Sequence, residues 1–221
     1  MNRIGILELQ GDFALHHCIF KDMGIESVSV KLPKDLDGIE GLVIPGGEST
    51  TMSLLIDKFD LREPILSFAI NYPIMGTCAG LILMAKKVYD SRVVPLGLLN
   101  VSVDRNAYGR QIMSSTETGK FYFGEEYSKF PATLIRAPKI TEVGKNVQVL
   151  GSNYHEEPLV VLSGHFLGLS FHPEIDGISI FHEILFDSKS KYFRTNLKKH
   201  KNGDPKTIQI DNKLISVSYG K

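Results

Sequence analysis

Short apolar runs alternate with helix-like segments through the first part of the chain, and this alternation restricts the possible folds more than any other feature. Four runs are expected to be strands: Ile4–Leu9, Val28–Lys31, Gly41–Ile44 and Pro73–Met75. Helical spacing is expected over Ala14–Met23, Thr51–Lys58, Arg62–Asn71 and from Gly80 through Val88, with Ser49 or Thr50 capping the second helix. Such an alternation favours a parallel sheet that carries helices on both faces.

The pattern changes after Val88, where apolar runs follow one another with short turns between them. The expected strands there are Val93–Arg105, Thr133–Ile135, Val147–Ser152, Leu159–Ser163 and Phe166–Leu169, and apolar spacing predicts a last helix over Ile178–Phe186. Strands joined in this way fit antiparallel additions to the sheet. The predicted fold class is therefore α/β, a three-layer sandwich with a mostly parallel central sheet plus antiparallel additions.

The end of the chain differs in composition from the rest. Residues 187–221 contain nine Lys or Arg against three Asp, whereas the whole chain has 25 basic and 25 acidic residues. The hypothesis is one main domain over residues 1–190, followed by a basic C-terminal extension of unknown role over residues 191–221. That extension is either a solvated tail or a basic arm that contacts a partner, and Lys206–Ser218 has some strand character.

Charge and cysteine content limit the class of protein. A formal net charge of zero gives no indication that nucleic acid or a membrane surface is the main partner. Two cysteines, Cys18 and Cys78, are too few for a disulfide framework and fit a reducing compartment. The first residues lack the apolar stretch of a signal peptide, and no run reaches the roughly 20 apolar residues that span a bilayer. We expect a cytoplasmic protein.

The segment Gly76-Thr77-Cys78-Ala79-Gly80 lies between an expected strand and an expected helix. A sharp strand-to-helix turn needs small residues on both sides of a nucleophile, and it lifts the nucleophile above the sheet edge. A helix N-terminus favours a thiolate, and the backbone N–H of Ala79 could donate to an oxyanion. An inert buried cysteine is the alternative, which the flanking glycines argue against. Cys78 is therefore the candidate nucleophile, whereas Cys18, in the middle of an expected helix, is expected in the core or on the helix surface.

A thiol nucleophile needs a base, and the base needs a group that orients it. The best pair is His172 and Glu174, separated by Pro173 and placed just after an expected strand, where the carboxyl edge of a parallel sheet holds active sites. The other histidines lack this context and are expected to be structural: His16, His17, His155, His165, His182 and His200. No Cys or His pair has the spacing of metal ligands, so no metal is expected.

Adjacent glycines follow the third expected strand, in the segment Pro45–Thr50. Such a turn lets backbone N–H groups converge on an anion, although a plain tight turn has the same composition. A phosphate-binding P-loop needs a later Gly-Lys-Ser/Thr, which this segment lacks. The interpretation is an oxyanion hole formed by Gly46, Gly47 and Ala79, beside a cradle for an amide substrate.

These motifs, with Cys78 between glycines and His172 two residues before Glu174, resemble those of the class I, triad-type glutamine amidotransferases. Four more segments narrow the resemblance to the family of glutaminase subunits of pyridoxal 5'-phosphate synthases: Gly5–Phe13, Pro45–Thr51, Arg105–Gln111 and Ile135–Pro138. The resemblance extends from about Ile4 to Phe186. The triad motifs alone indicate the class, and the four segments together are much more specific.

The resemblance implies a class I glutamine amidotransferase-like fold and the hydrolysis of L-glutamine to L-glutamate and ammonia. It implies a catalytic triad of Cys78, His172 and Glu174, no cofactor, and glutamine contacts at Gly47, Glu48, Ser49, Arg105, Ile135 and Arg136. It also implies a partner, a (β/α)8-barrel synthase subunit that uses the ammonia to make pyridoxal 5'-phosphate, in assemblies with twelve copies of each subunit. In this family the glutaminase is poorly active until the synthase docks.

Three alternatives remain open at this point. A glutaminase that serves another synthase has the same chemistry, and the Gly5–Phe13 and Arg105–Gln111 segments argue against it. A non-catalytic subunit on the same fold is disfavoured because all three triad residues are present. A cysteine hydrolase or peptidase of similar topology is disfavoured by the arginine-containing segments, and alkylation of Cys78 by a glutamine analogue would distinguish it.

Overall fold

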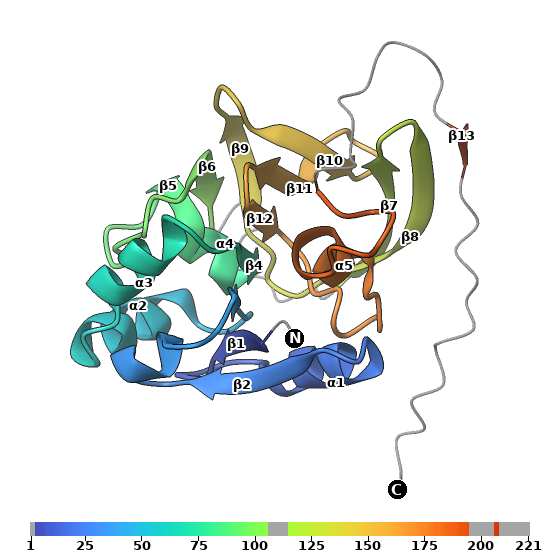
Figure 1. The fold of residues 1–221 in the computed structure, drawn as a ribbon. Coiled ribbons are helices and arrows are strands. Elements are labelled where there is room, and N and C mark those ends of the chain that lie inside the picture. Colours follow the sequence, from blue (N-terminus) through green and yellow to red (C-terminus); the bar gives the residue numbers. More distant parts are fainter. Residues whose placement is uncertain (1–2, 106–114, 195–205, 208–221) are drawn as a thin grey trace, which may run out of the picture.

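The structure is a computed structural model in which residues 3–105, 115–194 and 206–207 are described. These residues form five α-helices, α1 (Ala14–Asp22), α2 (Ser49–Lys58), α3 (Arg62–Ala69), α4 (Ala79–Met84) and α5 (Ile180–Phe186), and a 3₁₀ helix over Pro33–Leu36. The first strands are β1 (Arg3–Leu7), β2 (Glu26–Val30), β3 (Gly41–Ile44), β4 (Ile74–Thr77), β5 (Ala85–Val88) and β6 (Leu99–Asp104). The later strands are β7 (Ser115–Phe123), β8 (Glu126–Leu134), β9 (Lys139–Val143), β10 (Gln148–Ser152), β11 (Pro158–Ser163), β12 (Phe166–Leu169) and β13 (Lys206–Thr207). Figure 1 shows how they are arranged.

Ten strands form one mixed sheet in the order β13-β8-β7-β10-β11-β12-β4-β3-β1-β2. The strands from β12 to β2 are parallel to one another, and β11, β10, β7 and β8 extend the sheet with antiparallel pairing. A second sheet has the order β5-β6-β9. The predicted α/β class with both kinds of strand pairing is confirmed, and the antiparallel part is larger than expected because β7 and β8 have nine residues each.

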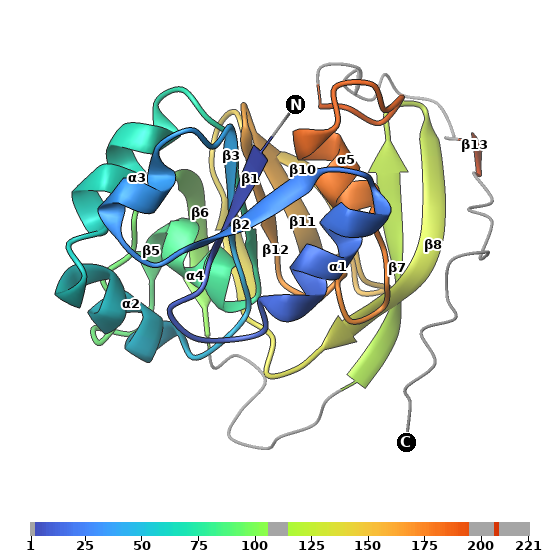
Figure 2. The same cartoon turned by 60° about the horizontal axis from the view of Figure 1, so that its bottom comes forward.

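The main sheet separates two helical layers, as Figure 2 shows from the side: α2 and α3 lie on one face and α1 and α5 on the other. Successive residues of one strand pack into the two cores, because side chains alternate between the faces of a strand. Val43 packs with the α1 and α5 layer, whereas Leu42 and Ile44 pack with the α2 and α3 layer. A strand buried on both faces is apolar throughout, which explains the uninterrupted apolar run of β3.

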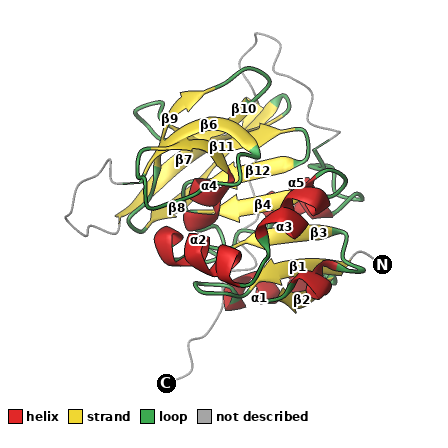
Figure 3. Cartoon of the chain, turned by 90° about the vertical axis from the view of Figure 1, so that its left-hand side faces the viewer, coloured by secondary structure: helices red, strands yellow, loops and turns green. Residues whose placement is uncertain are grey.

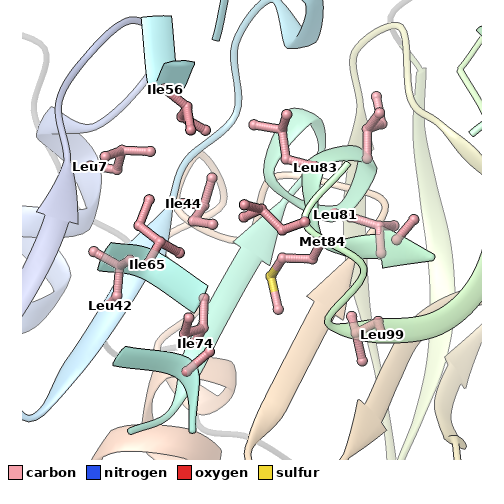
Figure 4. Packing of buried hydrophobic residues seen from close by; sticks show 14 of the residues in the cluster. Leu7, Leu42, Ile44, Ile56, Ile65, Ile74, Leu81, Leu83, Met84 and Leu99 are labelled. Carbon is pink, nitrogen blue, oxygen red and sulfur yellow. The ribbon is translucent and has the colours of Figure 1, made fainter. Parts of the chain in front are cut away.

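The hydrophobic core between the main sheet and helices α2, α3 and α4 supports the strands that lead to the site. Figure 4 shows Leu42, Ile44 and Ile74 from the sheet facing Ile65 of α3 and Leu83 of α4. All five side chains are fully buried. Burial of each such side chain contributes about 1.5–3 kcal/mol to the stability of the fold. The strands that carry the site are therefore firmly anchored in the core.

The antiparallel half is covered differently. Figure 3 shows most of the helices gathered around the parallel strands, with β6, β9 and β10 at the opposite end of the molecule. Aromatic side chains fill the space between this half and α5. Phe121 stacks on Phe130 with ring centroids 4.2 Å apart, and Phe181 of α5 meets Phe121 and Phe171 edge-on at 5.5 Å. This packing ties α5 to the strand that leads into His172.

Two expected elements around α4 are wrong. The helix after Gly80 ends at Met84 instead of Val88, since the backbone turns extended at Ala85 and forms β5, which pairs with β6. The expected strand Val93–Arg105 is a strand only over Leu99–Asp104. Pairing between residues distant in sequence outweighs the local helix propensity of the Ala-Lys-Lys segment.

The expected cap of the second helix is also wrong. Neither Ser49 nor Thr50 is the N-cap, because the carboxylate of Glu48 accepts hydrogen bonds from the N–H groups of Thr50 (3.3 Å) and Thr51 (2.7 Å). A carboxylate at a helix N-terminus is stabilised by the free N–H groups and by the helix dipole. The helix consequently begins two residues earlier than predicted.

Residues 187–194, which end the described range 115–194, pack against α5. The N–H of Arg194 donates to the carbonyl of Ile184 at 2.8 Å, and its guanidinium donates to the carbonyl of Leu185 at 2.7 Å. Most of the expected extension over residues 191–221 lies outside the described residues, as does the Asn106–Gln111 part of the Arg105 segment. The division into a domain and an extension stays a prediction. None of the helices in the described part of the chain has the length and hydropathy needed to cross a bilayer.

Candidate active site

Neighbouring parallel strands bring the candidate residues to one edge of the sheet. β3, β4 and β12 lie side by side, with Ile44 opposite Gly76 and Thr77 opposite Leu169. Gly46 follows β3, Cys78 follows β4 directly, and His172 follows β12. Because the carboxyl ends of parallel strands meet at one edge, three segments that are far apart in sequence converge there.

Cys78 has a backbone conformation that L-residues rarely adopt, with φ 48° and ψ −101°. Its N–H donates to the carbonyl of Leu169 at 2.8 Å, and Ala79 begins α4 directly after it. The turn requires Gly80, because a Cβ there would lie 1.9 Å from the carbonyl oxygen of Ile44. This is the strained strand-to-helix turn that presents a nucleophile above a sheet.

His172 and Glu174 form a buried pair beside this turn. The His172 Nδ1 atom lies 2.7 Å from Glu174 Oε1, and the His172 backbone N–H donates to the carbonyl of Thr133 at 3.2 Å. Burial by itself lowers the pKa of His172, but the Cys78 sulfur and the Glu174 carboxylate together outweigh burial and raise that pKa to about 10. The geometry therefore favours an imidazolium that faces the sulfur, with the carboxylate behind it.

The glycine turn is held between His172 and the segment after β1. The Gly46 carbonyl accepts from the N–H of Asp12 at 3.0 Å, and the N–H of Glu48 donates to Gln10 Oε1 at 2.8 Å. A Cβ on Gly46 would lie 2.2 Å from His172 Cε1. Gln10 and Asp12 were not assigned a role from sequence. Their only signal was their place within the Gly5–Phe13 segment.

A cavity of about 360 Å³ opens above Cys78 and His172. All six residues expected to contact glutamine line it: Gly47, Glu48, Ser49, Arg105, Ile135 and Arg136. Gln10, Gly11, Asp12 and Ile82 complete the lining. The Cys78 sulfur lies 3.8 Å from the Ile135 carbonyl oxygen. Gly46, Ala79 and Glu174 are not among the lining residues, although they adjoin those that are.

One wall of the cavity carries an ion-pair network. The Arg105 guanidinium lies 2.9 Å from Glu48 Oε1 and 3.1 Å from Asp90 Oδ2. Burial alone would raise the pKa of Glu48, but hydrogen bonds from Thr50 and Thr51 lower it to about 2. Glu48 is therefore an anion that caps α2 and pairs with Arg105, so opposite charges stand together in the cavity that Cys78 also lines.

Two histidines that sequence reasoning left as structural, His16 and His182, lie behind Glu174. His16 Nε2 is 3.7 Å from Glu174 Oε2, and His16 Nδ1 is 2.9 Å from His182 Nε2. Nothing in their sequence spacing connects them to the His172 segment. Within the described ranges, no group of three or more His, Cys, Asp or Glu residues is arranged to hold a metal ion.

The mixed sheet, its two helical layers and the antiparallel additions make this a fold of the class I glutamine amidotransferases. A solved structure described as a glutamine amidotransferase matches it with a TM-score of 0.76 and 34% sequence identity, covering 82% of this chain and 96% of that one. More specifically, the chain belongs to the SNO glutamine amidotransferase family, whose sequence profile matches residues 6–187. The family resemblance identified from the motifs is confirmed.

Curated relatives agree with this assignment. A pyridoxal 5'-phosphate synthase subunit PdxT from Brevibacillus brevis is 42% identical over 198 residues, covering 86% of this chain and 98% of its own length. The subunit of the same name from Oenococcus oeni is 44% identical over 181 residues, covering 82% of this chain and 93% of its own length. The similarity thus extends over nearly the whole of each relative.

Proposed function

We propose that this chain is the glutaminase subunit of a pyridoxal 5'-phosphate synthase. It hydrolyses L-glutamine to L-glutamate and ammonia, and it delivers the ammonia to a synthase subunit. The observation that carries this proposal is the strained Cys78 turn, which stands beside the buried pair of His172 and Glu174 and opens into a cavity lined by opposite charges. Family membership and the names of the relatives support the same assignment.

The first half of the reaction forms a thioester. His172 holds the proton that it takes from Cys78, so the pair is a thiolate and an imidazolium before glutamine reacts, and the thiolate attacks the side-chain carbonyl carbon of glutamine. The N–H of Ala79 and an N–H from Gly46 or Gly47 stabilise the oxyanion that results. The His172 imidazolium, held by Glu174, then protonates the leaving nitrogen, so that ammonia departs and a γ-glutamyl thioester remains.

The second half reverses the roles. His172, now neutral, removes a proton from water, and the hydroxide attacks the thioester carbonyl. The same oxyanion donors act again, and collapse of the intermediate expels the Cys78 thiolate, releases glutamate and restores the thiolate–imidazolium pair. Glu174 stabilises the imidazolium in both halves, which fits its place on the far side of the ring from Cys78.

The cavity suits a free amino acid because it offers both charges. The α-carboxylate of glutamine binds a guanidinium, from Arg105 or Arg136, and the α-ammonium binds the Glu48 carboxylate. Ser49 and the Ile135 carbonyl are the neutral polar groups beside them. An acidic or basic side chain in place of the neutral amide would leave a charge without a partner, which accounts for selection of glutamine.

The partner we propose is a (β/α)8-barrel synthase subunit, in an assembly with twelve copies of each chain. Loss of a single oxyanion donor in comparable enzymes raises the barrier by about 3–4 kcal/mol. A small displacement of the Gly46–Gly47 turn is therefore enough to silence the free subunit, and docking of the partner would align it.

The test is glutamate release from glutamine by the purified chain alone and after addition of the barrel synthase subunit. Strong stimulation on mixing, abolished by Cys78→Ala, is expected. Alkylation of Cys78 by an electrophilic glutamine analogue, blocked by excess glutamine, separates this enzyme from a general cysteine hydrolase. Activity that survives Cys78→Ala would contradict the mechanism, and absence of stimulation by the synthase would contradict the partner.

A further inference from the structure

The carboxylate of Glu174 has one oxygen, Oε2, which faces away from His172 and is called here its outer oxygen. Oε1 pairs with His172, whereas Oε2 is buried and makes no hydrogen bond to any described residue. Leaving a carboxylate oxygen buried without a donor is costly. The His16 Nε2 atom lies 3.7 Å away, close enough to become a hydrogen bond with a small shift.

His16 is itself fixed by groups from two other elements. It comes from α1, and its Nδ1 lies 2.9 Å from Nε2 of His182 on α5, while its Nε2 lies 3.4 Å from Thr77 Oγ1. Both imidazoles are completely buried. Phe20 packs edge-on against the His182 ring, with centroids 5.2 Å apart. The cluster fills the space between the sheet and the α1–α5 layer, directly behind the triad.

The protons of the two rings can be assigned from their neighbours. A carboxylate only accepts hydrogen bonds, so His16 Nε2 must carry a proton to interact favourably with Glu174. In a neutral ring Nδ1 is then an acceptor, which makes His182 Nε2 the donor to it. The reverse assignment places a bare nitrogen against Glu174 and a buried, unpaired N–H at His182 Nδ1, the atom that has no partner among the described residues. An orphan donor is the rarer and costlier case.

We propose that His16 is a positioning residue of the glutaminase, which donates from Nε2 to the outer oxygen of Glu174, with His182 fixing the tautomer of His16. The proposal rests on the proposed function. The row of interacting side chains then runs from Cys78 to His172, from His172 to Glu174, and from Glu174 to the neutral imidazoles of His16 and His182.

A neutral imidazole is a better hydrogen-bond donor to Glu174 at this position than a charged one. Burial lowers the pKa of His16, although the nearby Glu174 carboxylate opposes this, and it lowers the pKa of His182; both are about 3, so neither ring is charged at neutral pH. A positively charged His16 would compete with the His172 imidazolium for the carboxylate and weaken the catalytic base. A neutral N–H orients the carboxylate without that competition.

The test compares two substitutions at His16 in the full glutaminase–synthase complex. His16→Leu removes the donor, and we expect kcat for glutamate release to fall about 10- to 100-fold with KM for glutamine unchanged, because the group lost is a hydrogen bond to a charge. His16→Gln keeps an N–H at a similar distance from the backbone, and we expect it to restore kcat to within about threefold of the wild type.

The matched control is His17, the next residue of α1. It bonds to Ser27 of β2 and to Glu8, the residue that follows β1. His17→Leu and His17→Gln are expected to leave kcat unchanged. Equal losses for His16→Leu and His16→Gln, or a KM effect without a kcat effect, would overturn the positioning role.

A second measurement on the unmodified chain keeps the proposal testable if His16→Leu does not fold. Imidazole ¹⁵N spectra at neutral pH are expected to show both His16 and His182 as neutral rings protonated at Nε2. A His16 protonated at Nδ1 would refute the assignment. Because this readout needs no turnover, it is separate from failure of the proposed function, which would appear as a wild-type complex without glutaminase activity.

Discussion

The backbone of Cys78 is strained, and its strain can be measured by comparing Cys78→Ala with Cys78→Gly. Both variants remove the sulfur and both are expected to lack glutaminase activity with the synthase present. They differ in backbone freedom: at φ 48° and ψ −101° any residue with a Cβ is in an unfavourable region, whereas glycine is not. Cys78→Gly is therefore expected to be the more stable variant.

The size of the difference follows from two opposing terms. Conformations of this kind cost about 1–3 kcal/mol, and glycine loses about 0.5–1 kcal/mol more conformational entropy on folding than alanine. The net advantage of Cys78→Gly is between about 0 and 2.5 kcal/mol, with a central value of about 1 kcal/mol. For a domain of 150–250 residues about 1 kcal/mol shifts Tm by about 2–4 °C, so the expected gain in Tm is about 2–4 °C and at most about 10 °C.

The assay is thermal and urea unfolding of the two variants, with the other cysteine as the control. Cys18 is exposed in the middle of α1, where the backbone is helical. There Cys18→Gly is expected to be less stable than Cys18→Ala by about 1 kcal/mol. The sign of the alanine–glycine difference should thus invert between the two positions. Finding Cys78→Gly less stable than Cys78→Ala would refute the strain argument.

Three further predictions follow from the same site. Gly46→Ala places a Cβ 2.2 Å from His172 Cε1, so the ring must move and kcat of the complex should fall at least about 100-fold; activity within threefold of the wild type would contradict this. Glu48→Gln should lower Tm at pH 7, and the difference should shrink between pH 4.5 and 2 in melting curves, since the folded pKa of about 2 lies below the unfolded value and its stabilisation is lost only as pH falls through that range. The folded pKa values of His16 and His182, about 3, lie below the ordinary histidine value of 6.5. Stability should therefore fall as pH drops from 6.5, because the unfolded chain binds protons that the folded chain cannot. His182→Gln should make this dependence of the unfolding free energy on pH less steep in urea titrations at several pH values.

The sequence located β3 and β12 best among the parallel strands, because they lie inside the sheet and are almost entirely buried. The expected strands Gly41–Ile44 and Phe166–Leu169 have the bounds of β3 and β12 in the structure. Such runs are apolar without alternation, so local composition is sufficient to locate them. The same reasoning located Cys78 and His172, since Cys78 follows β4 directly and His172 lies three residues after β12.

Elements whose form depends on distant partners could not be predicted in this way. The Ala85–Val88 segment has the composition of a helix and forms a strand because β6 offers it hydrogen bonds. The N-cap of α2 was missed for a different, local reason: the Glu48 carboxylate accepts from the N–H groups of Thr50 and Thr51, whereas Ser and Thr are the commoner N-cap residues. Only the β5 pairing depends on residues more than ten positions away.

The sequence by itself determined the α/β class, the strands of the parallel half and the residues of the candidate triad. Only the tertiary structure decided which side chains pack around Glu174. His16 belongs to α1 and His182 to α5, and nothing in their local sequence relates either to Glu174. They meet because α1 and α5 cover the same face of the sheet, and burial there removes the water that would otherwise satisfy the carboxylate.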